Sequence, residues 1–445
     1  MLQGHITELE ERFEQLERSS KRSAAPFARP DDKRKKDKKR PGRKAGHRGQ
    51  HRQRPSDAAV DRHVDVGLSH CPHCGAPLDK ASERAIEQTI IEVPPVKPEV
   101  TRLTTYRNHC HGCDQKVASN HPLQVSTASG AAGTHLGPRA LAIAASLNKA
   151  LGLTLRRTCQ ALRQLLGIEL TAGGLSQALA RMAERLHPDY QTLLQDVKSQ
   201  PALYTDETSW WVGGPGYSLW VLTNDAGTCY RVVSSRSRAE AEALIGSDFA
   251  GVLISDCLNI YDDLTFRQHK CYAHHLKAIG QALDRPTARG STYLRELRGL
   301  LHGAMALKTM KADLPVVVVR RMRKALEDNA RRLLSQQPGG PGHDPGDEAQ
   351  SRHEEKLRQR LAKQQDHLFT FLDHDEVEAT NNRAERQLRP AVISRKISCG
   401  NKTENGVRTW ETLASLAATC QQKHLSFIDF VVKKIPLATI PQPAR

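Results

Sequence analysis

Residues 202–212 read ALYTDETSWWV, a run of strand-favouring side chains that opens the part of the chain on which the fold depends. A glycine-rich turn leads to YSLWVLTND at 217–225, and a second short turn leads to TCYRVVSS at 228–235. Strand-like runs separated by short glycine turns are typical of antiparallel neighbours. The sequence therefore predicts a three-stranded meander.

The next segments continue the pattern and carry two acids. A helical RAEAEALIG at 238–246 precedes an apolar GVLIS at 251–255, and a strand-like QHKCY at 268–272 leads into a helix, so the order is βββαβαβ. Asp206 lies within the first strand and Asp256 directly follows the fourth, so the two carboxylates converge if these strands are neighbours. Crowded carboxylates repel each other unless a divalent cation neutralises them. The alternative is that each Asp only caps a turn or faces solvent.

A third acid lies in VEATNNRAERQLRPAVISRK at 377–396. Thr380 or Asn381 can cap a helix that carries Glu385 among several arginines. Glu385 then completes a site with the two aspartates. The alternative is that it only pairs with Arg389 at i,i+4 on a solvated helix.

The charge balance favours an anionic partner, nucleic acid above all. The 445 residues include 66 Lys and Arg against 49 Asp and Glu, a formal net charge of +17. Residues 29–54 alone hold 13 − 3 = +10 of this charge and too few apolar side chains to fold. The segment is a solvated linker, and we expect it also to follow a phosphate backbone. The side chains expected to contact DNA there are Lys35, Lys36, Lys38, Lys39, Arg40, Arg43 and Lys44.

Two CxxC pairs lie downstream of this basic segment. The pairs are Cys71 with Cys74 and Cys110 with Cys113, and the β-branched segments 86–93 and 100–108 between them predict a hairpin. Such an arrangement is typical of a zinc ribbon, in which four thiolates hold one structural Zn²⁺. The interval between the pairs is longer than usual. The alternatives are that a neighbouring histidine replaces a cysteine or that the pairs bind no metal.

Residues 153–186 show two helical patterns separated by Gly167, Ile168 and Glu169, with Thr171 as a cap of the second. This arrangement resembles a helix-turn-helix in which Gln177 and Arg181 face DNA. The alternative is an ordinary helical hairpin.

Compartment and membrane association follow from simpler features. The start of the chain has a short heptad pattern from Leu2 to Leu16 rather than a basic and apolar leader, and no run of about eighteen apolar residues occurs. Ten cysteines in a chain of this length are too sparse for a disulfide scaffold. We therefore expect a cytoplasmic protein without a membrane span.

Several motifs together resemble the transposases of the insertion-sequence-66 family, a DDE transposase group. DETSWWV at 206–212, SDCLNIYDDL at 255–264, KCYAHHLK at 270–277 and TNNRAERQLRP at 380–390 followed by RKISCG carry the resemblance. The upstream modules occur in the same order as in that family, so the similarity spans nearly the whole chain. A departure is CLN after Asp256, which concerns the shape of that loop.

The resemblance implies an RNase H-like core with Asp206, Asp256 and Glu385 as the catalytic triad holding two Mg²⁺ or Mn²⁺ ions. It also implies that His274 lines the active site and that Lys277 and Arg395 contact phosphates. The first implied partner is double-stranded DNA, which the protein meets as the inverted-repeat ends of the element and as target DNA. The others are further copies of the chain, in a homodimer or higher oligomer, and companion proteins encoded with the element. The implied location is the bacterial cytoplasm, at the nucleoid.

The expected fold is multidomain α+β and α/β, with a zinc ribbon and a helix-turn-helix-like region ahead of a mixed-sheet core that contains a helical insertion. The expected function is metal-dependent DNA cleavage and 3′-hydroxyl strand transfer. The alternatives are a non-catalytic DNA-binding repressor derived from a transposase and an RNase H-fold nuclease. The expected segments are a coiled-coil-like helix at 1–20, a basic linker at 21–62, the zinc ribbon at 63–125, the helical DNA-binding region at 126–200, the first part of the core at 201–285, the helical insertion at 286–374, the last core helix at 375–400 and a C-terminal helical segment at 401–445.

Overall fold

The computed structural model describes residues 54–79, 86–119, 121, 123–124, 134–284, 291–335 and 348–435, without the side chains of 348–353. The chain divides into two units, with the boundary between Lys97 and Pro98. Each unit is described by itself. The expected helix at 1–20 and the basic side chains from Lys35 to Lys44 lie outside the described residues, so both predictions stay untested.

The first unit contains one short 3-10 helix, η2 (Asp57–Ala59), and the turn of the first CxxC pair. In this turn the Gly75 N–H donates to the Cys71 carbonyl at 2.9 Å, and the Cys71 N–H donates to the Ala76 carbonyl at 2.9 Å. Gly75 has φ +72°, a left-handed conformation that favours glycine. The backbone therefore folds tightly around the two thiols.

The second unit begins with a hairpin around the second CxxC pair, formed by β1 (Arg107–Cys110) and antiparallel β2 (Gln115–Ala118). The prediction of a hairpin from segments 86–93 and 100–108 was wrong, because no strand is assigned there before Arg107. Side chains such as Ile90 and Val100 are 87% and 91% exposed. They have no apolar surface to pack against, so β-propensity alone does not produce a strand.

The central sheet of the second unit confirms the predicted meander. Its strands lie in the order β5-β4-β3-β6-β7, with the first three antiparallel and β3, β6 and β7 mutually parallel. One short helix, α5 (Arg238–Ile245), and one 3-10 turn, η6 (Asn259–Tyr261), connect the later strands. The strands are β3 (Ala202–Trp210), β4 (Tyr217–Asn224), β5 (Gly227–Val233), β6 (Val252–Ser255) and β7 (Arg267–Lys270).

Helices occupy most of the remaining described chain and fall into three groups. Before the sheet lie α2 (Pro138–Ala145), the π-helix η5 (Ser146–Ala150), α3 (Leu155–Leu166) and α4 (Ala172–Lys198). Between the second and third acids lie α6 (Tyr272–Leu283), α7 (Thr292–Met310), η8 (Lys311–Asp313), α8 (Val316–Ser335), α9 (Glu348–Lys363), η9 (Gln365–His367) and α10 (Thr370–Asp373). The last group is α11 (Asn382–Ser398), α12 (Glu404–Gln422) and α13 (Phe427–Lys434).

The sheet separates two apolar cores because its side chains alternate between faces. Tyr204 and Ile254 belong to the core shared with α6, α7 and α11, whereas Leu203 and Leu253 belong to the core shared with α4 and α5. Helix α12 contributes to both cores and packs along β5. Buried apolar area of this kind is the main term that stabilises the fold.

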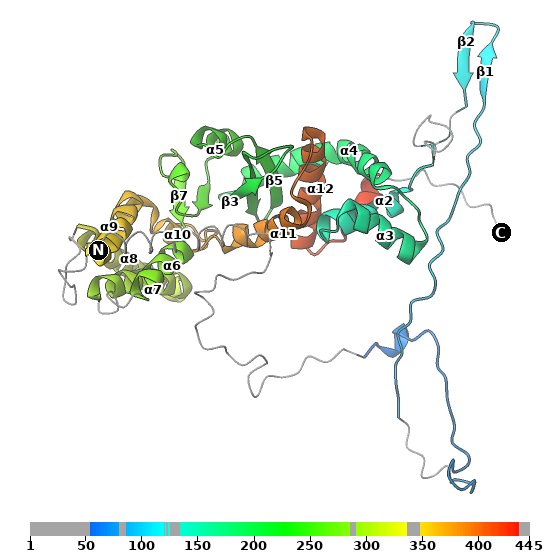
Figure 1. The fold of residues 1–445 in the computed structure, drawn as a ribbon. Coiled ribbons are helices and arrows are strands. Elements are labelled where there is room, and N and C mark those ends of the chain that lie inside the picture. The colour runs from blue at the N-terminus through cyan, green and yellow to red at the C-terminus, as the bar shows by residue number, and fades with distance from the viewer. Residues whose placement is uncertain are drawn as a thin grey trace, which may run out of the picture. The chain divides into compact units, whose positions relative to one another are not determined.

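Helical regions lie on both sides of the sheet along its strand order (Figure 1), and the second half of α4 also packs on one face of the sheet. Helices α7, α8 and α9 lie on the β7 side, and α3 and α4 on the β5 side. The described part of the expected insertion is mostly helical, as predicted. Among the described residues, no helix combines the length and the apolar character that a bilayer crossing requires.

The link between α3 and α4 follows the predicted pattern. Gly167 ends α3 with φ 65°, and the Thr171 hydroxyl accepts a hydrogen bond from the Gly174 N–H at 3.0 Å at the start of α4. A glycine in the left-handed conformation ends the first helix, and a threonine cap begins the second. The helical pair is therefore confirmed, and its contact with DNA stays a prediction.

We expect Asn224→Ala to lower the free energy of unfolding by about 2 to 4 kcal/mol. The buried Asn224 amide donates to the Val197 carbonyl at 2.7 Å and to the Ala202 carbonyl at 3.0 Å, so it joins the end of α4 to the start of β3. The substitution leaves both carbonyls without this donor. Urea denaturation followed by tryptophan fluorescence measures the loss. The exposed Asn405→Ala is the control, and an equal effect of both substitutions would contradict the assigned role of Asn224.

Candidate active site

Asp206 and Asp256 lie side by side on neighbouring parallel strands. Ala202 pairs with Val252 and Tyr204 pairs with Ile254, so the same register, continued by two residues, places Asp206 level with Asp256. Residues two apart on a strand share a face. Asp206 therefore lies in β3, and Asp256 directly follows β6, the parallel neighbour of β3; a common face for the two carboxylates stays a prediction.

Glu207 is on the opposite face of β3, as the alternation of the strand requires. Its side chain accepts hydrogen bonds from the Arg236 guanidinium, whose Nε lies 2.9 Å away, and from the Tyr261 hydroxyl. The carboxylate is fully buried and has both a positive partner and a neutral donor. Glu207 is therefore a buried structural acid rather than a member of the site.

Two other acids near Asp256 also have partners. Asp262 is buried and lies 3.3 Å from the Lys270 ammonium, which is buried too, and it accepts from the Gln364 amide at 2.7 Å. Asp263 is exposed and pairs with Lys363 at 3.5 Å. Helix α9, which carries Lys363, thus holds the loop that follows Asp256.

Glu385 reaches the same region from α11, and Asn381 fixes the start of that helix. The Asn381 side chain donates to the Thr205 carbonyl on β3 at 2.7 Å instead of capping its own helix, and its backbone N–H donates to the Cys271 sulfur at 3.0 Å. These two bonds attach the start of α11 to β3 and to the start of α6. Sequence reasoning treated Asn381 as a cap, and only the fold reveals its partners.

Burial and neighbouring negative charges both act on the Asp206 carboxyl. Burial is the main cause that raises the pKa of Asp206 to about 7, and the negative charges of Glu207, Asp256 and Glu385 add to the rise, against a hydrogen bond from the Glu207 N–H. Within the described residues, neither Asp206 nor Asp256 forms an ion pair with a lysine or an arginine. Neither aspartate thus has a direct ion-pair partner among the described residues, although the charge of Asp256 acts on Arg236 and Lys270, and grouped carboxylates of this kind suit a divalent metal ion.

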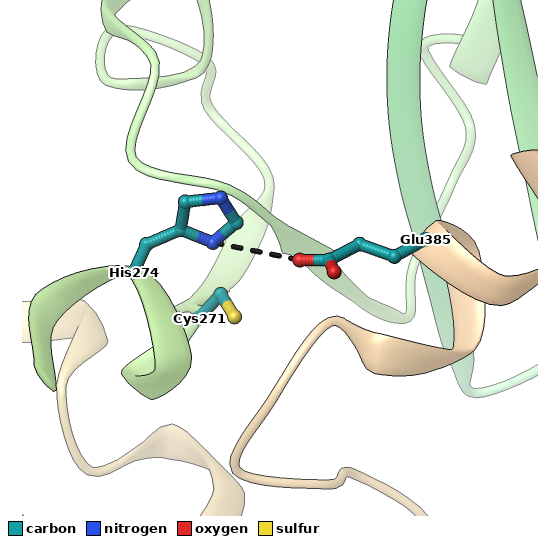
Figure 2. A group of neighbouring side chains, drawn as sticks. All are labelled: Cys271, His274 and Glu385. Carbon is teal, nitrogen blue, oxygen red and sulfur yellow. Dashed lines mark ion pairs between the residues drawn. The ribbon is translucent and has the colours of Figure 1, made fainter. Parts of the chain in front are cut away.

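His274 lies beside Glu385, as the prediction that it lines the site requires. Its Nδ1 is 3.8 Å from the Glu385 carboxylate and makes no hydrogen bond, and Figure 2 shows the imidazole directed toward that carboxylate. The ligand atoms of Cys271, His274 and Glu385 lie within 4.8 Å of one another. Cys271 is buried, which raises the pKa of its thiol.

The two expected phosphate contacts differ in their surroundings. Lys277 is exposed on α6. Arg395 donates to the hydroxyl of Thr208 at 2.9 Å and to the hydroxyl of Ser209 at 2.6 Å, so it attaches α11 to β3. A structural role accounts for these bonds of Arg395, and phosphate contacts of both side chains stay predictions.

The two CxxC pairs have the same local conformation. Hydrogen bonds from backbone N–H groups of residues within each turn lower the pKa of Cys71 and of Cys110. Gly75 and Asp114, which follow the second cysteine of each pair, both have positive φ. The pairs belong to different units, so a site that joins all four cysteines stays a prediction.

Comparison with known proteins gives a family. The model described as "Transposase IS66 family" matches residues 133–409, which is well over half of the chain. An uncharacterized protein of Sinorhizobium fredii, y4qI, is 24% identical over 301 residues, which cover 60% of this chain and 53% of that protein. A second uncharacterized protein of the same organism, y4jO, is 31% identical over 83 residues, 19% of this chain and 26% of that protein. The chain therefore spans about half and about a quarter of the lengths of these relatives.

The raised pKa of Asp206 predicts a pH-dependent stability in magnesium-free buffer. The folded protein keeps a proton on this group up to about pH 7, whereas the unfolded chain releases it near its ordinary pKa of 3.8. The free energy of unfolding therefore falls as the pH rises through this window. At about pH 8 we expect Asp206→Asn to be more stable than the wild-type protein by about 1 to 3 kcal/mol, and by less at about pH 5.

Urea denaturation at a series of pH values measures this difference. The exposed Asp263→Asn is the control and should show no comparable gain at high pH. An Asp206→Asn protein that is no more stable than the wild type at any pH would contradict the crowding of the three acids.

Proposed function

Because the chain belongs to the IS66 transposase family, we propose that it is a DDE transposase whose catalytic acids are Asp206, Asp256 and Glu385. The observation that supports the proposal is that Asp206 lies in β3, Asp256 directly follows the parallel neighbour β6, and Glu385 is on α11, which packs against β3. The strand order, three antiparallel strands followed by two parallel ones, supports an RNase H-like core.

The three carboxylates fit a pair of Mg²⁺ or Mn²⁺ ions. All are oxygen ligands of the kind that these ions prefer. Burial first and neighbouring negative charges second raise the pKa of Asp206, and a cation would neutralise those charges. When bound, the ions supply an activated nucleophile and stabilise the leaving oxygen. Cation binding should release the proton that Asp206 otherwise retains.

The protein's own side chains orient this site. Asn381 holds the first turn of α11 against β3, which keeps Glu385 in place. His274 lies next to Glu385, with its Nδ1 3.8 Å from the carboxylate, and so borders the position that this carboxylate occupies. Leu258 donates its N–H to Asp256 at 3.0 Å, which fixes that carboxylate at the end of β6. Such positioning is what a metal-dependent site requires of its surroundings.

The proposed reaction has two steps on DNA. In the first, water attacks the phosphodiester at an element end, the P–O3′ bond breaks, and a free 3′-hydroxyl remains on the element. In the second, that hydroxyl attacks a target phosphodiester, a new P–O bond forms, and the target's 3′-oxygen leaves. Neither step requires a covalent bond to the protein.

DNA recognition is assigned to the segments before the core. The basic segment at 29–54 contributes electrostatic affinity, which should fall steeply with salt. Gln177 and Arg181 are exposed on α4 and are the proposed contacts of the helical pair. Double-stranded element ends and target DNA are the proposed partners, with the protein acting as a homodimer or higher oligomer at the nucleoid and with companion proteins of the element.

A structural Zn²⁺ bound by Cys71, Cys74, Cys110 and Cys113 completes the proposal. Each pair forms a tight turn with backbone N–H groups directed at a sulfur, which favours the thiolate form that binds zinc.

A strand-transfer assay tests the catalytic proposal. With purified protein, Mg²⁺ or Mn²⁺ and DNA carrying the element ends, we expect nicked and joined products. Asp206→Asn, Asp256→Asn and Glu385→Gln should each reduce both products by at least about a thousandfold, because each removes a metal ligand. Asp263→Asn, an exposed acid in the same loop region, should retain activity.

The products also separate the alternatives. Joining that survives Asp206→Asn or Glu385→Gln would disprove the assignment of the triad. Nicks without any joined strands would identify a nuclease. Binding to the ends without cleavage under any divalent ion would identify a DNA-binding repressor.

Zinc removal gives an independent prediction. We expect a chelator to unfold the region of the cysteine pairs while the sheet stays folded, because structural zinc contributes directly to folding free energy. Native mass spectrometry should show one zinc ion per chain. Its loss in Cys71→Ser, but not in the buried Cys229→Ser, would support the site. A purified wild-type protein without zinc would count against it.

A further inference from the structure

A groove in the second unit lies between α3 and α4 and has a volume of about 980 Å³. Cavities of this size bind small molecules or single nucleotide units. The groove lies in the helical region on the β5 side of the sheet, apart from the three acids.

Four arginines line the groove from opposite sides. Arg156 and Arg163 come from α3, and Arg181 and Arg185 come from α4. All four are exposed, and within the described residues none forms an ion pair or a side-chain hydrogen bond. Glu169 is the one carboxylate among the lining residues. Like charges that face each other repel, so the groove should attract an anion that relieves the repulsion.

Other lining residues, which we call the floor of the groove, are apolar or carry amide groups. Leu136, Leu141 and Leu170 supply apolar surface, and the amide side chains of Gln160 and Gln177 offer both donors and acceptors. An apolar floor accommodates the flat face of a base, amides match its polar edge, and arginines bind phosphates bidentately. The three features together match a nucleotide unit of a DNA strand.

The concave shape argues for an unpaired strand rather than for a duplex. A recognition helix reads a duplex by inserting a convex face into the major groove. Gln177 and Arg181 instead share a hollow with the side chains of α3, as the lining of the groove shows. A base that is already paired cannot reach the floor of such a hollow.

We propose that this groove binds one unpaired DNA strand, with a base on the apolar floor and the flanking phosphates between the arginines of α3 and α4. The proposal rests on the proposed DNA-processing function. It adds the substrate form, a strand separated from its complement, and it changes the expected role of Gln177 and Arg181 from reading a duplex to holding this strand.

Binding of labelled DNA to the full-length protein tests the proposal. Fluorescence anisotropy in magnesium-free buffer compares a single strand of about twelve nucleotides with a hairpin duplex of matched charge. We expect Arg163→Glu and Arg181→Glu each to weaken single-strand binding by at least about tenfold and duplex binding by less than about threefold. Arg157→Glu is the matched control, because Arg157 is exposed on the same helix but does not line the groove. It should change both affinities by less than about twofold.

The comparison with the duplex removes the contribution of the basic segment, which binds both forms. Equal losses for single strand and duplex, or an equal effect of Arg157→Glu, would overturn the proposal. Because no metal or cleavage is involved, this result is independent of the strand-transfer assay and of the three acids.

A second measurement uses the wild-type protein and does not depend on how the variants fold. Cys159 lines the same groove and is partly exposed. Single-stranded DNA should slow its alkylation, measured by peptide mass spectrometry, more than the duplex does. Unchanged alkylation of Cys159 at saturating single strand would place the strand elsewhere on the protein.

Discussion

Repulsion between carboxylates that the backbone forces together is the constraint on which the site depends. The parallel pairing of β3 with β6 sets Asp206 beside Asp256, and neither has a lysine or arginine partner within the described residues. Burial of the apolar cores on both faces of the sheet offsets the unfavourable free energy of this repulsion. Acids held close together at a cost in stability are typical of functional clusters.

Glu385 must be positioned in a different way, because a long helical segment separates it in the chain from Asp206 and Asp256. Closing such a loop costs entropy, and a few specific bonds must hold its far end in place. Asn381, Arg395 and the Cys271 sulfur provide them, and all three join α11 or its start to β3 or α6. Several motif residues near Glu385 thus serve position rather than chemistry. The helices between the acids can vary in length without moving Glu385 while these bonds remain.

The sequence predicts the parts of this fold that depend on local periodicity. The meander, the placement of Asp206 and Glu207 on opposite faces, and the break between α3 and α4 at Gly167 all follow from patterns over a few residues. The misplaced hairpin shows the limit, because Ile90 and Val100 favour strands but have no surface to cover. The partners of Asn381 and Arg395, and the groove between α3 and α4, depend on segments far apart or on packing between helices. No local pattern contains that information.

Helix α4 fixes the distance between the groove and the sheet. It runs as one element of 27 residues, with Gln177 near its start in the groove and Val197 near its end in the core beneath the sheet. At a rise of roughly 1.5 Å per residue, the interval between these two positions is about 30 Å. One helix, which continues through Pro188, therefore connects the groove to the sheet without an intervening loop. If the groove and the sheet act on the same DNA strand as proposed, the length of this one helix sets the number of nucleotides between the two contacts.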